Sequence, residues 1–271
     1  MKLGFIGVGN MGGAILGGVV RSGFLPPQDL LVYDVSASAC EAAREQYGVA
    51  VATSVGALVD ACDVTMLCVK PVYLEGVLRE ARPHATGKNF ISIAAGWTYA
   101  MLTGILDAAS GAKVLRVMPN TPALVGEGFT ALCQETGVDA DTFAWAERLF
   151  ATLGKAQAFP EAMFDAVVAV TGSSPAYVFM LIEAMADGAV AQGMSRAIAL
   201  RAAAQAVYGS AKMVLDTGEH PARLKDAVCS PAGTTIDAVE ALEKDGFRYA
   251  VLDAMRVCAE KSRSMASGKK E

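Results

Sequence analysis

Histidine and paired cysteine are scarce in this sequence of 271 residues, and this scarcity limits the chemistry that it can carry. Only two histidines occur, and His220 precedes a proline in a Gly-Glu-His-Pro turn, so we expect a structural role for it. The six cysteines lie singly, without a Cys-x-x-Cys pair. This pattern argues against a metal site or a disulfide framework, and it favours reduced thiols in a cytoplasmic protein.

The chain also lacks a block of lysine or arginine, and its formal net charge is -5. A nucleic-acid partner is therefore not expected, because the phosphates need a basic face. No secretory signal is expected either, because a strand-like run follows Met1 and Lys2 directly. The three long uncharged stretches (residues 3–20, 89–106 and 166–182) contain glycine or polar turn residues, as at 171–175. A membrane helix needs about 20 apolar residues without such breaks, so we interpret the stretches as buried segments and expect no membrane.

Residues 1–160 alternate between strand and helix patterns. Strands are expected at residues 2–6, 30–33, 64–69, 90–93, 114–117 and 156–159, and helices at 10–22, 37–47, 72–82, 100–109 and 143–153. Strands that alternate with helices of this length indicate a mostly parallel sheet with right-handed crossovers. The fold class is α/β, and residues 1–160 are expected to form a doubly wound, Rossmann-type dinucleotide-binding domain.

Residues 161–271 are expected to form an all-α domain. Helices are expected at residues 161–170, 176–192, 196–215, 221–228, 235–244 and 248–263. Residues 176–191 are apolar nearly all round apart from Glu183 and Asp187, and such a helix must be buried on most sides. We expect a second copy of the chain to supply part of this burial, which makes the domain a dimerisation domain; a compact monomeric bundle is the alternative.

A glycine-rich segment near the start, LGFIGVGNMGGAI, places Gly7, Gly9 and Gly12 in G-x-G-x-x-G spacing between a strand and a helix. Gly7 allows a tight turn, Gly9 lets the backbone approach a pyrophosphate, and Gly12 lets the helix pack on the strand. The free N–H groups at the helix start then hold the phosphates. We predict a dinucleotide site at these glycines and at the residues between them, Val8, Asn10 and Met11.

Asp34 ends the second strand, at the position where an acid accepts hydrogen bonds from the adenine ribose and favours NAD over NADP. Ser36 and Ser38 follow, however, and their hydroxyl groups can receive a 2′-phosphate. Asp34 can also simply cap the next helix. The preference between NADPH and NADH therefore stays open.

The next strand ends are expected to line the cofactor crevice, as in other open α/β sheets. These ends are CVKP (68–71), with Val69 and Lys70, and IAAGW (93–97), with Ala94 and Ala95. MPNTP (118–122), with Asn120, is another rigid loop at a strand end. Lys70 either neutralises a cofactor phosphate or is a solvated loop lysine. Asn120 is placed to reach the nicotinamide or the substrate.

A second glycine-containing loop, CSPAGTT, opens a helix at residues 229–235. The N–H groups of a first helical turn lack intrahelical acceptors, and small residues leave them open to a carboxylate. An ordinary threonine N-cap is the alternative.

Six segments of the chain, taken in order, resemble the pyrroline-5-carboxylate reductase family: GFIGVGNMGGAILGG, VKP, IAAGWT, RVMPNTPALVGEG, TGSSPAYVFMLIEAMADGAV and GEHPARLKDAVCSPAGTTIDAVEALE. The resemblance runs from residue 2 to about residue 264. In one place the chain departs from the family, which reads Ser-Pro-Gly-Gly where this chain has Ala232 before Gly233. If Ala232 needs a positive φ, the departure costs stability or changes the shape of the loop.

The resemblance implies a homodimer or a decamer with interlocked helical domains that reduces the C=N bond of 1-pyrroline-5-carboxylate to give L-proline. NADPH is the implied cofactor, with NADH as an alternative. Backbone N–H groups around Ala232, Gly233 and Thr234 would bind the substrate carboxylate, and Thr235 would be the catalytic residue that hydrogen-bonds the ring nitrogen. Glu161 corresponds to an acidic residue beside the product; taken alone, it reads as a first-turn acid favoured by the helix dipole.

Two other functions fit part of the sequence. A β-hydroxyacid dehydrogenase shares the glycine-rich start and the helical second half, but it needs a catalytic lysine early in that half, and residues 161–195 contain no lysine or arginine. A nicotinamide-binding sensor without catalysis needs the first loop but not the second.

Overall fold

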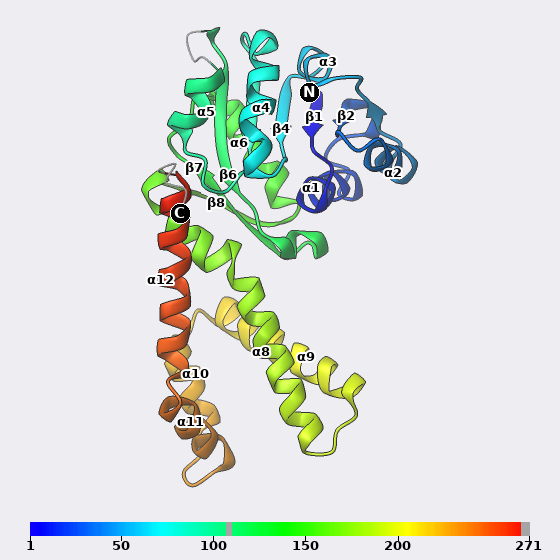
Figure 1. The fold of residues 1–271 in the computed structure, drawn as a ribbon. Helices are drawn as coiled ribbons and strands as arrows, with labels where there is room; N and C mark the ends of the chain where they lie inside the picture. Colours follow the sequence, from blue (N-terminus) through cyan, green and yellow to red (C-terminus); the bar gives the residue numbers. More distant parts are fainter. Residues whose placement is uncertain (107–109, 267–271) are drawn as a thin grey trace. The chain divides into compact units, whose positions relative to one another are not determined.

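The computed structural model describes residues 1–106 and 110–266, and its first half is built on one eight-stranded sheet (Figure 1). The strands lie in the order β3-β2-β1-β4-β5-β6-β7-β8. Their bounds are β1 Leu3–Ile6, β2 Leu30–Tyr33, β3 Ala50–Val51, β4 Val64–Leu67, β5 Asn89–Ser92, β6 Lys113–Met118, β7 Gly128–Cys133 and β8 Gly154–Phe159. All neighbours pair in parallel except β6 and β7. The predicted doubly wound, mostly parallel sheet is confirmed.

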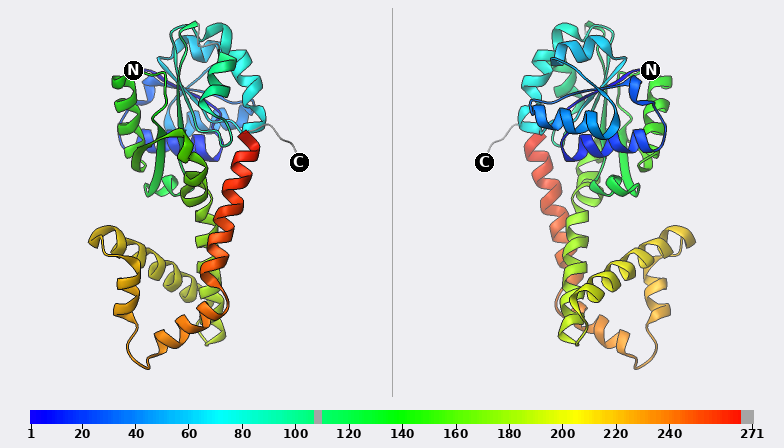
Figure 2. Two further views of the ribbon diagram at one scale, coloured as in Figure 1. Left: turned by 90° about the vertical axis from the view of Figure 1, so that its left-hand side faces the viewer. Right: turned by 90° about the vertical axis from the view of Figure 1, so that its right-hand side faces the viewer.

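Helices cover both faces of this sheet (Figure 2). One face packs against α1 (Asn10–Arg21), α2 (Ala37–Tyr47) and α6 (Ala140–Ala151) through a core that includes Leu16, Val19 and Phe150. The other face packs against α3 (Val55–Ala61), α4 (Pro71–Ala81) and α5 (Tyr99–Leu106) through Leu58, Leu74 and Leu102. Burial on both faces explains why the central strands β1 and β4 are fully buried.

Besides short 3-10 turns, two strands and one α-helix described in this half were not predicted: β3, β7 and α3. β3 and α3 are only two and seven residues long, so they carry little periodic pattern. β7 forms the antiparallel step between β6 and β8, and this pairing depends on contacts that are remote in sequence.

The chain divides into two compact units, residues 1–173 with the end of the chain from Cys258, and residues 174–257. The predicted boundary at residue 160 follows the end of β8 at Phe159 and stays a prediction. Every regular element described after Pro160 is helical. The helices are α7 Phe164–Val167, α8 Ser174–Ala191, α9 Arg196–Thr217, α10 Pro221–Val228, α11 Thr234–Lys244 and α12 Phe247–Ala266, with a 3-10 turn at Glu161–Met163 and a π-helical segment at Val168–Gly172.

The second unit has a small core of its own. Its buried cluster consists of Ala186, Ala199 and Ala203, where α8 packs against α9. On α8, Phe179 is 62% exposed and Met180 is 69% exposed within the single chain. The interpretation of residues 166–182 as a buried segment is therefore wrong for the isolated chain.

The predicted interruption at residues 171–175 is a bend at Ser173, but it does not end the helical run from Glu161 to Ala191. The Gly-Ser-Ser-Pro sequence forms the junction between a π-helical segment and the first turn of α8. A proline is tolerated in a first turn, since its missing N–H would have no acceptor there. By length and composition alone, this run is the one helix among the described residues that could span a membrane, and 17% of its most apolar window is buried inside the chain.

Candidate functional site

The glycine-rich loop between β1 and α1 has the geometry of a phosphate cradle. Gly7 has a φ of +95°, and a Cβ on it would lie 2.9 Å from the Cys68 backbone. A Cβ on Gly12 would lie 2.1 Å from the Gly7 carbonyl oxygen, so the helix can approach the strand only without a side chain there. A Cβ on Gly9, in contrast, would meet nothing within 4 Å. Gly9 thus leaves open space in front of the backbone, where a pyrophosphate fits.

The start of α1 is free to bind an anion. Gly9 is the N-cap, no side chain caps the helix, and its first turn contains no acidic residue. The first-turn N–H groups of a helix have no intrahelical acceptors, and the helix dipole is positive at this end. The residues present therefore fit a dinucleotide phosphate.

A cavity of about 540 Å³ opens beside this helix start. Eight of the predicted cofactor residues line it: Gly9, Asn10, Met11, Val69, Lys70, Ala94, Ala95 and Asn120. The other seven lining residues are Cys68, Pro71, Ile93, Met118, Pro119, Thr121 and Gly172. All except Gly172 lie in the strand-end segments 68–71, 93–97 and 118–122, so Gly172 is the one lining residue outside the stretches to which the sequence pointed.

Lys70 and Cys68 give this cavity its chemical character. Lys70 is exposed, it is the one charged side chain in the lining, and it forms no ion pair within the described part of the chain. It is thus available for a phosphate. Burial raises the pKa of the Cys68 thiol well above its ordinary range, so this thiol stays protonated and unreactive.

Asn120 forms part of the cavity wall. Its amide nitrogen donates a hydrogen bond to the Thr171 carbonyl oxygen at 3.0 Å, and its amide oxygen accepts one from the Phe129 N–H at 2.8 Å. Thr171 lies in the π-helical segment, where wider turns change the usual backbone pairing. Asn120 thereby fixes Gly172 at the cavity, and any contact of Asn120 with a nicotinamide remains a prediction.

Asp34 binds the glycine-rich loop. One carboxylate oxygen accepts a hydrogen bond from the Val8 N–H at 2.9 Å, and the other accepts one from the Ser36 N–H at 2.9 Å. The N-cap of α2 is Ser36, whose hydroxyl oxygen accepts from the Ala39 N–H, so the alternative of Asp34 as that cap is excluded. Ser36 and Ser38 share a hydrogen bond between their hydroxyl groups at 2.9 Å.

A second cavity, of about 420 Å³, lies against Asp34 and Gly7. Its other lining residues are mostly apolar or aromatic: Ile6, Tyr33, Val35, Val69, Tyr73 and Val77. The two cavities share Val69; Gly7 lines this one, and Gly9 lines the first. An apolar cavity next to a carboxylate suits an adenosine, whereas the first cavity suits the nicotinamide half.

Glu161 forms an ion pair inside the first unit. Its Oε1 accepts hydrogen bonds from the Tyr99 N–H at 2.7 Å and from an Arg116 guanidinium N–H at 2.9 Å. The Arg116 side chain is 5% exposed and lies over the Phe164 ring. The Glu161 N–H donates to Glu135, which holds the pKa of the Glu135 carboxyl below its usual range. The Glu161 carboxylate thus joins α5, β6 and the start of the helical half. A contact between Glu161 and the substrate stays a prediction.

The loop before α11 lies in the second unit and has an open helix start. Gly233 is the N-cap, and no side chain caps α11. The alternative of a threonine N-cap is therefore excluded, and the helix begins at Thr234, one residue before the predicted start. A Cβ on Gly233 would lie 2.4 Å from the Ser230 hydroxyl oxygen and 3.1 Å from the Ser230 carbonyl oxygen, so the Ser230 side chain would have to move. Ala232 has a φ of +54°, and it is the one non-glycine residue with a positive φ among those described.

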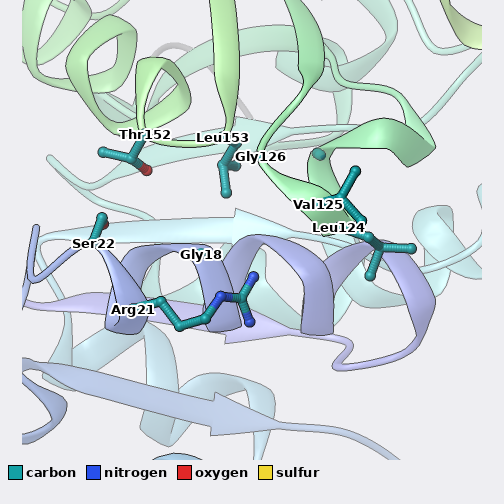
Figure 3. A pocket seen from close by; sticks show the side chains of 9 residues that line it. Gly18, Arg21, Ser22, Leu124, Val125, Gly126, Thr152 and Leu153 are labelled. Atoms are coloured by element: carbon teal, nitrogen blue, oxygen red, sulfur yellow. The ribbon is translucent and has the colours of Figure 1, made fainter. Parts of the chain in front are cut away.

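A separate cavity of about 290 Å³ lies at the other end of α1, between Gly18, Arg21 and the 3-10 turn Thr121–Val125 (Figure 3). Two hydroxyl groups point to it, but both donate hydrogen bonds to backbone carbonyls of their own helices, Ser22 to Val19 and Thr152 to Leu149. The remaining polar side chain of the lining is the charged one of Arg21.

Comparisons with known proteins agree on one family. Residues 161–265 match the family described as pyrroline-5-carboxylate reductase dimerisation, and residues 2–96 match the one described as NADP oxidoreductase, coenzyme F420-dependent. Pyrroline-5-carboxylate reductase of Escherichia coli K12 is 48% identical over 266 residues, which are 98% of each chain. The protein of the same name from Methanosarcina acetivorans is 40% identical over 99% of this chain and 98% of its own.

Among solved structures, the pyrroline carboxylate reductase of Plasmodium falciparum with NADP bound superposes with a TM-score of 0.90. It is 32% identical and is covered to 98%, as is this chain. The fold, the geometry of the glycine-rich loop and the full-length similarity all point to the same family. The chain belongs to the pyrroline-5-carboxylate reductase family.

Proposed function

We propose that this protein reduces 1-pyrroline-5-carboxylate to L-proline with NADPH, with NADH as a possible second cofactor. The observation that carries the proposal is the presence of two uncapped helix starts, α1 with its glycine-rich cradle and α11 with the Gly233 loop, which suit two separate anions. Full-length similarity to reductases of that name supports the choice of substrate. The second loop argues against a sensor, which would need only the first, and the absence of lysine and arginine from residues 161–195 argues against a β-hydroxyacid dehydrogenase.

The chain needs little chemical machinery for this reaction. When bound, the cofactor supplies a hydride from C4 of its nicotinamide to the C=N carbon of the ring. The first-turn N–H groups of α11, with Ala232, Gly233 and Thr234, bind the substrate carboxylate and so fix the orientation of the ring. The Thr235 hydroxyl hydrogen-bonds the ring nitrogen, which carries its proton into the product amine. Positioning of this kind contributes about 7–11 kcal/mol when the reacting groups are held in contact.

The proposal includes an assembly of several chains. The exposed apolar residues of α8 and α9 and the match of residues 161–265 to a dimerisation family support a homodimer, with a decamer as a possible larger form. A partner chain would cover the apolar run Glu161–Ala191, so we infer that this run does not lie in a membrane. We further propose a cytoplasmic location, supported by six unpaired cysteines, and no nucleic-acid partner, supported by the net charge of -5.

Two neighbouring substitutions test the roles of the α11 loop. Thr235→Val should lower kcat strongly, because the ring nitrogen loses its hydrogen bond, while the Kd for NADPH stays nearly unchanged. Thr234→Val should change kcat and the KM for the imine much less, because it removes only a hydroxyl and keeps the backbone N–H that binds the carboxylate. Steady-state kinetics and an NADPH titration measure both variants. A Thr235→Val protein with weaker NADPH binding and normal turnover would show that the loop serves the cofactor and not the substrate.

A further inference from the structure

Two loops that line the 540 Å³ cavity are joined by one side chain, Trp97. The loop after β4 contributes Lys70 and Pro71, and the loop after β5 contributes Ala94 and Ala95. The Trp97 indole N–H donates a hydrogen bond to the Pro71 carbonyl oxygen at 3.1 Å. We propose that Trp97 is a positioning residue for the cofactor, which holds the Lys70–Pro71 corner in the place where Lys70 meets the cofactor phosphates. This inference rests on the proposed function of the cavity as the cofactor site.

The Lys70–Pro71 corner needs such an anchor. Pro71 is the first residue of α4 and Lys70 is its N-cap, and no side chain caps this helix start. The Tyr73 N–H donates a backbone hydrogen bond to the Lys70 carbonyl oxygen at 2.9 Å. The indole adds a bond from an element that is 26 residues away in sequence. A change in this corner moves the base of the Lys70 side chain directly.

Trp97 is itself held firmly, so it can transmit a fixed position. Its ring is half-buried and packs against the apolar core that α3, α4 and α5 share. On one side of it, Gly96 has a φ of +75°, and a Cβ there would lie 2.9 Å from the Met265 Cβ of α12. On the other side, the Tyr99 N–H binds Glu161 at 2.7 Å. A residue anchored on both sides loses little further freedom when its N–H binds Pro71.

The position of Lys70 matters because no other charged side chain lines the cavity. A lysine is a point charge on a flexible stem, so its contribution to phosphate binding depends on where its backbone starts. We therefore expect Trp97 to affect cofactor affinity through Lys70, and to affect the hydride-transfer step little.

Trp97→Phe keeps an aromatic ring in the core but removes the N–H donor. It should raise the Kd and the KM for NADPH about three- to tenfold, the factor that loss of one ordinary hydrogen bond gives. The kcat and the KM for the imine should stay within about twofold of wild type. The matched control is Trp145→Phe, because Trp145 is the other tryptophan of the chain and lies on the opposite face of the sheet, beside Phe24. This control should leave the Kd and the KM for NADPH, the kcat and the KM for the imine unchanged.

A double-mutant cycle tests the route through Lys70. In a Lys70→Met background, Trp97→Phe should change the Kd for NADPH by less than about twofold, because the charge that it positions is gone. An unchanged Kd in the single Trp97→Phe variant would overturn the inference. So would an equal effect in both backgrounds, or a general loss of kcat together with a lower Tm. A wild-type protein that binds NADPH but does not reduce the imine would instead contradict the proposed function alone, since the binding arm needs no substrate.

Discussion

At the scale of single residues, Ala232 stands out because its backbone conformation suits glycine. The left-handed region costs a non-glycine residue about 1–2 kcal/mol, because the Cβ approaches the next carbonyl oxygen. The strain lies in the loop that opens α11, where the family reads glycine and this chain has alanine. The sequence shows the departure from the family, but it does not show whether alanine lowers the stability of the loop, because the φ of residue 232 cannot be read from the sequence.

Ala232→Gly should therefore raise the free energy of unfolding. Relief of strain outweighs the extra freedom of glycine in the unfolded chain, which costs about 0.4–1 kcal/mol, so we expect a net gain of up to about 1 kcal/mol. Urea unfolding at a fixed protein concentration measures it. Gly233→Ala is the matched control and should destabilise, because alanine is a poor N-cap and its Cβ would lie 3.1 Å from the Ser230 carbonyl oxygen. A clear loss of stability in Ala232→Gly would mean that the loop is not strained.

Asp34 is the second residue whose role depends on geometry. Its two oxygens bind the Val8 and Ser36 N–H groups, so it holds the glycine-rich loop in shape, and its negative charge still lies beside the adenosine cavity. That charge should oppose a 2′-phosphate, which Ser36 and Ser38 could otherwise bind.

Asp34→Asn should raise the ratio of kcat/KM for NADPH to kcat/KM for NADH. The amide oxygen can still accept from Val8, the Ser36 N–H loses its acceptor, and the charge is removed. Two charges at about 4 Å in water interact by about 1 kcal/mol, which corresponds to about fivefold. Steady-state kinetics with both cofactors measure the ratio. If both values fall equally, Asp34 acts on the loop alone and does not discriminate between the cofactors.

At the scale of elements, local patterns predict what local interactions stabilise. β2 and α2 begin and end at the predicted residues, because Ser36 caps α2 and Gly48 ends it in the left-handed conformation. The cradle glycines are likewise visible, since their spacing encodes their roles. The π-helical segment, β7 and the Arg116–Glu161 pair could not be predicted, because each depends on partners that are remote in sequence.

The network around Glu161 connects the two halves of the sequence within the first unit. Arg116 is almost fully buried, so its charge needs the Glu161 carboxylate. Burial, together with the charge of Glu161, raises the pKa of the Cys133 thiol to about 12, so this thiol stays neutral beside the network. The ion pair also holds the start of α5, two residues after Trp97.

Glu161→Gln should lower the free energy of unfolding by about 3 kcal/mol, because Arg116 is left as a buried charge without a counter-ion. The exposed pair between Arg79 and Glu75 provides a matched control: Glu75→Gln should change stability by less than about 0.5 kcal/mol. Chemical unfolding of both variants provides the comparison. Equal effects would show that the Arg116 pair contributes no more than a surface pair.

At the scale of the whole molecule, the second unit cannot bury its apolar helices by itself. Three alanines form its buried cluster, while Met180 is 69% exposed and Leu215 is 82% exposed. An exposed apolar surface of this kind normally marks an interface. A second copy of the chain is the partner that the dimerisation-family match supports.

Sedimentation should therefore give a mass of at least twice the 28.1 kDa of one chain. Met180→Glu should shift the distribution toward the monomer, because a charge would be buried in the interface. Val125→Glu, at a position that is 77% exposed in the first unit, should leave the mass unchanged. A wild-type monomer at micromolar concentration would contradict the interlocked dimer.

The central claim is that the protein transfers a hydride from NADPH to the C=N carbon of 1-pyrroline-5-carboxylate. Incubation of the protein with 1-pyrroline-5-carboxylate and NADPH deuterated at the transferred C4 position tests this directly by mass spectrometry of the product. We predict proline with one deuterium on the ring carbon that belonged to the C=N bond. The amount of deuterated proline should increase in step with the oxidation of the cofactor. Folded protein that binds NADPH but yields no deuterated proline would contradict the account.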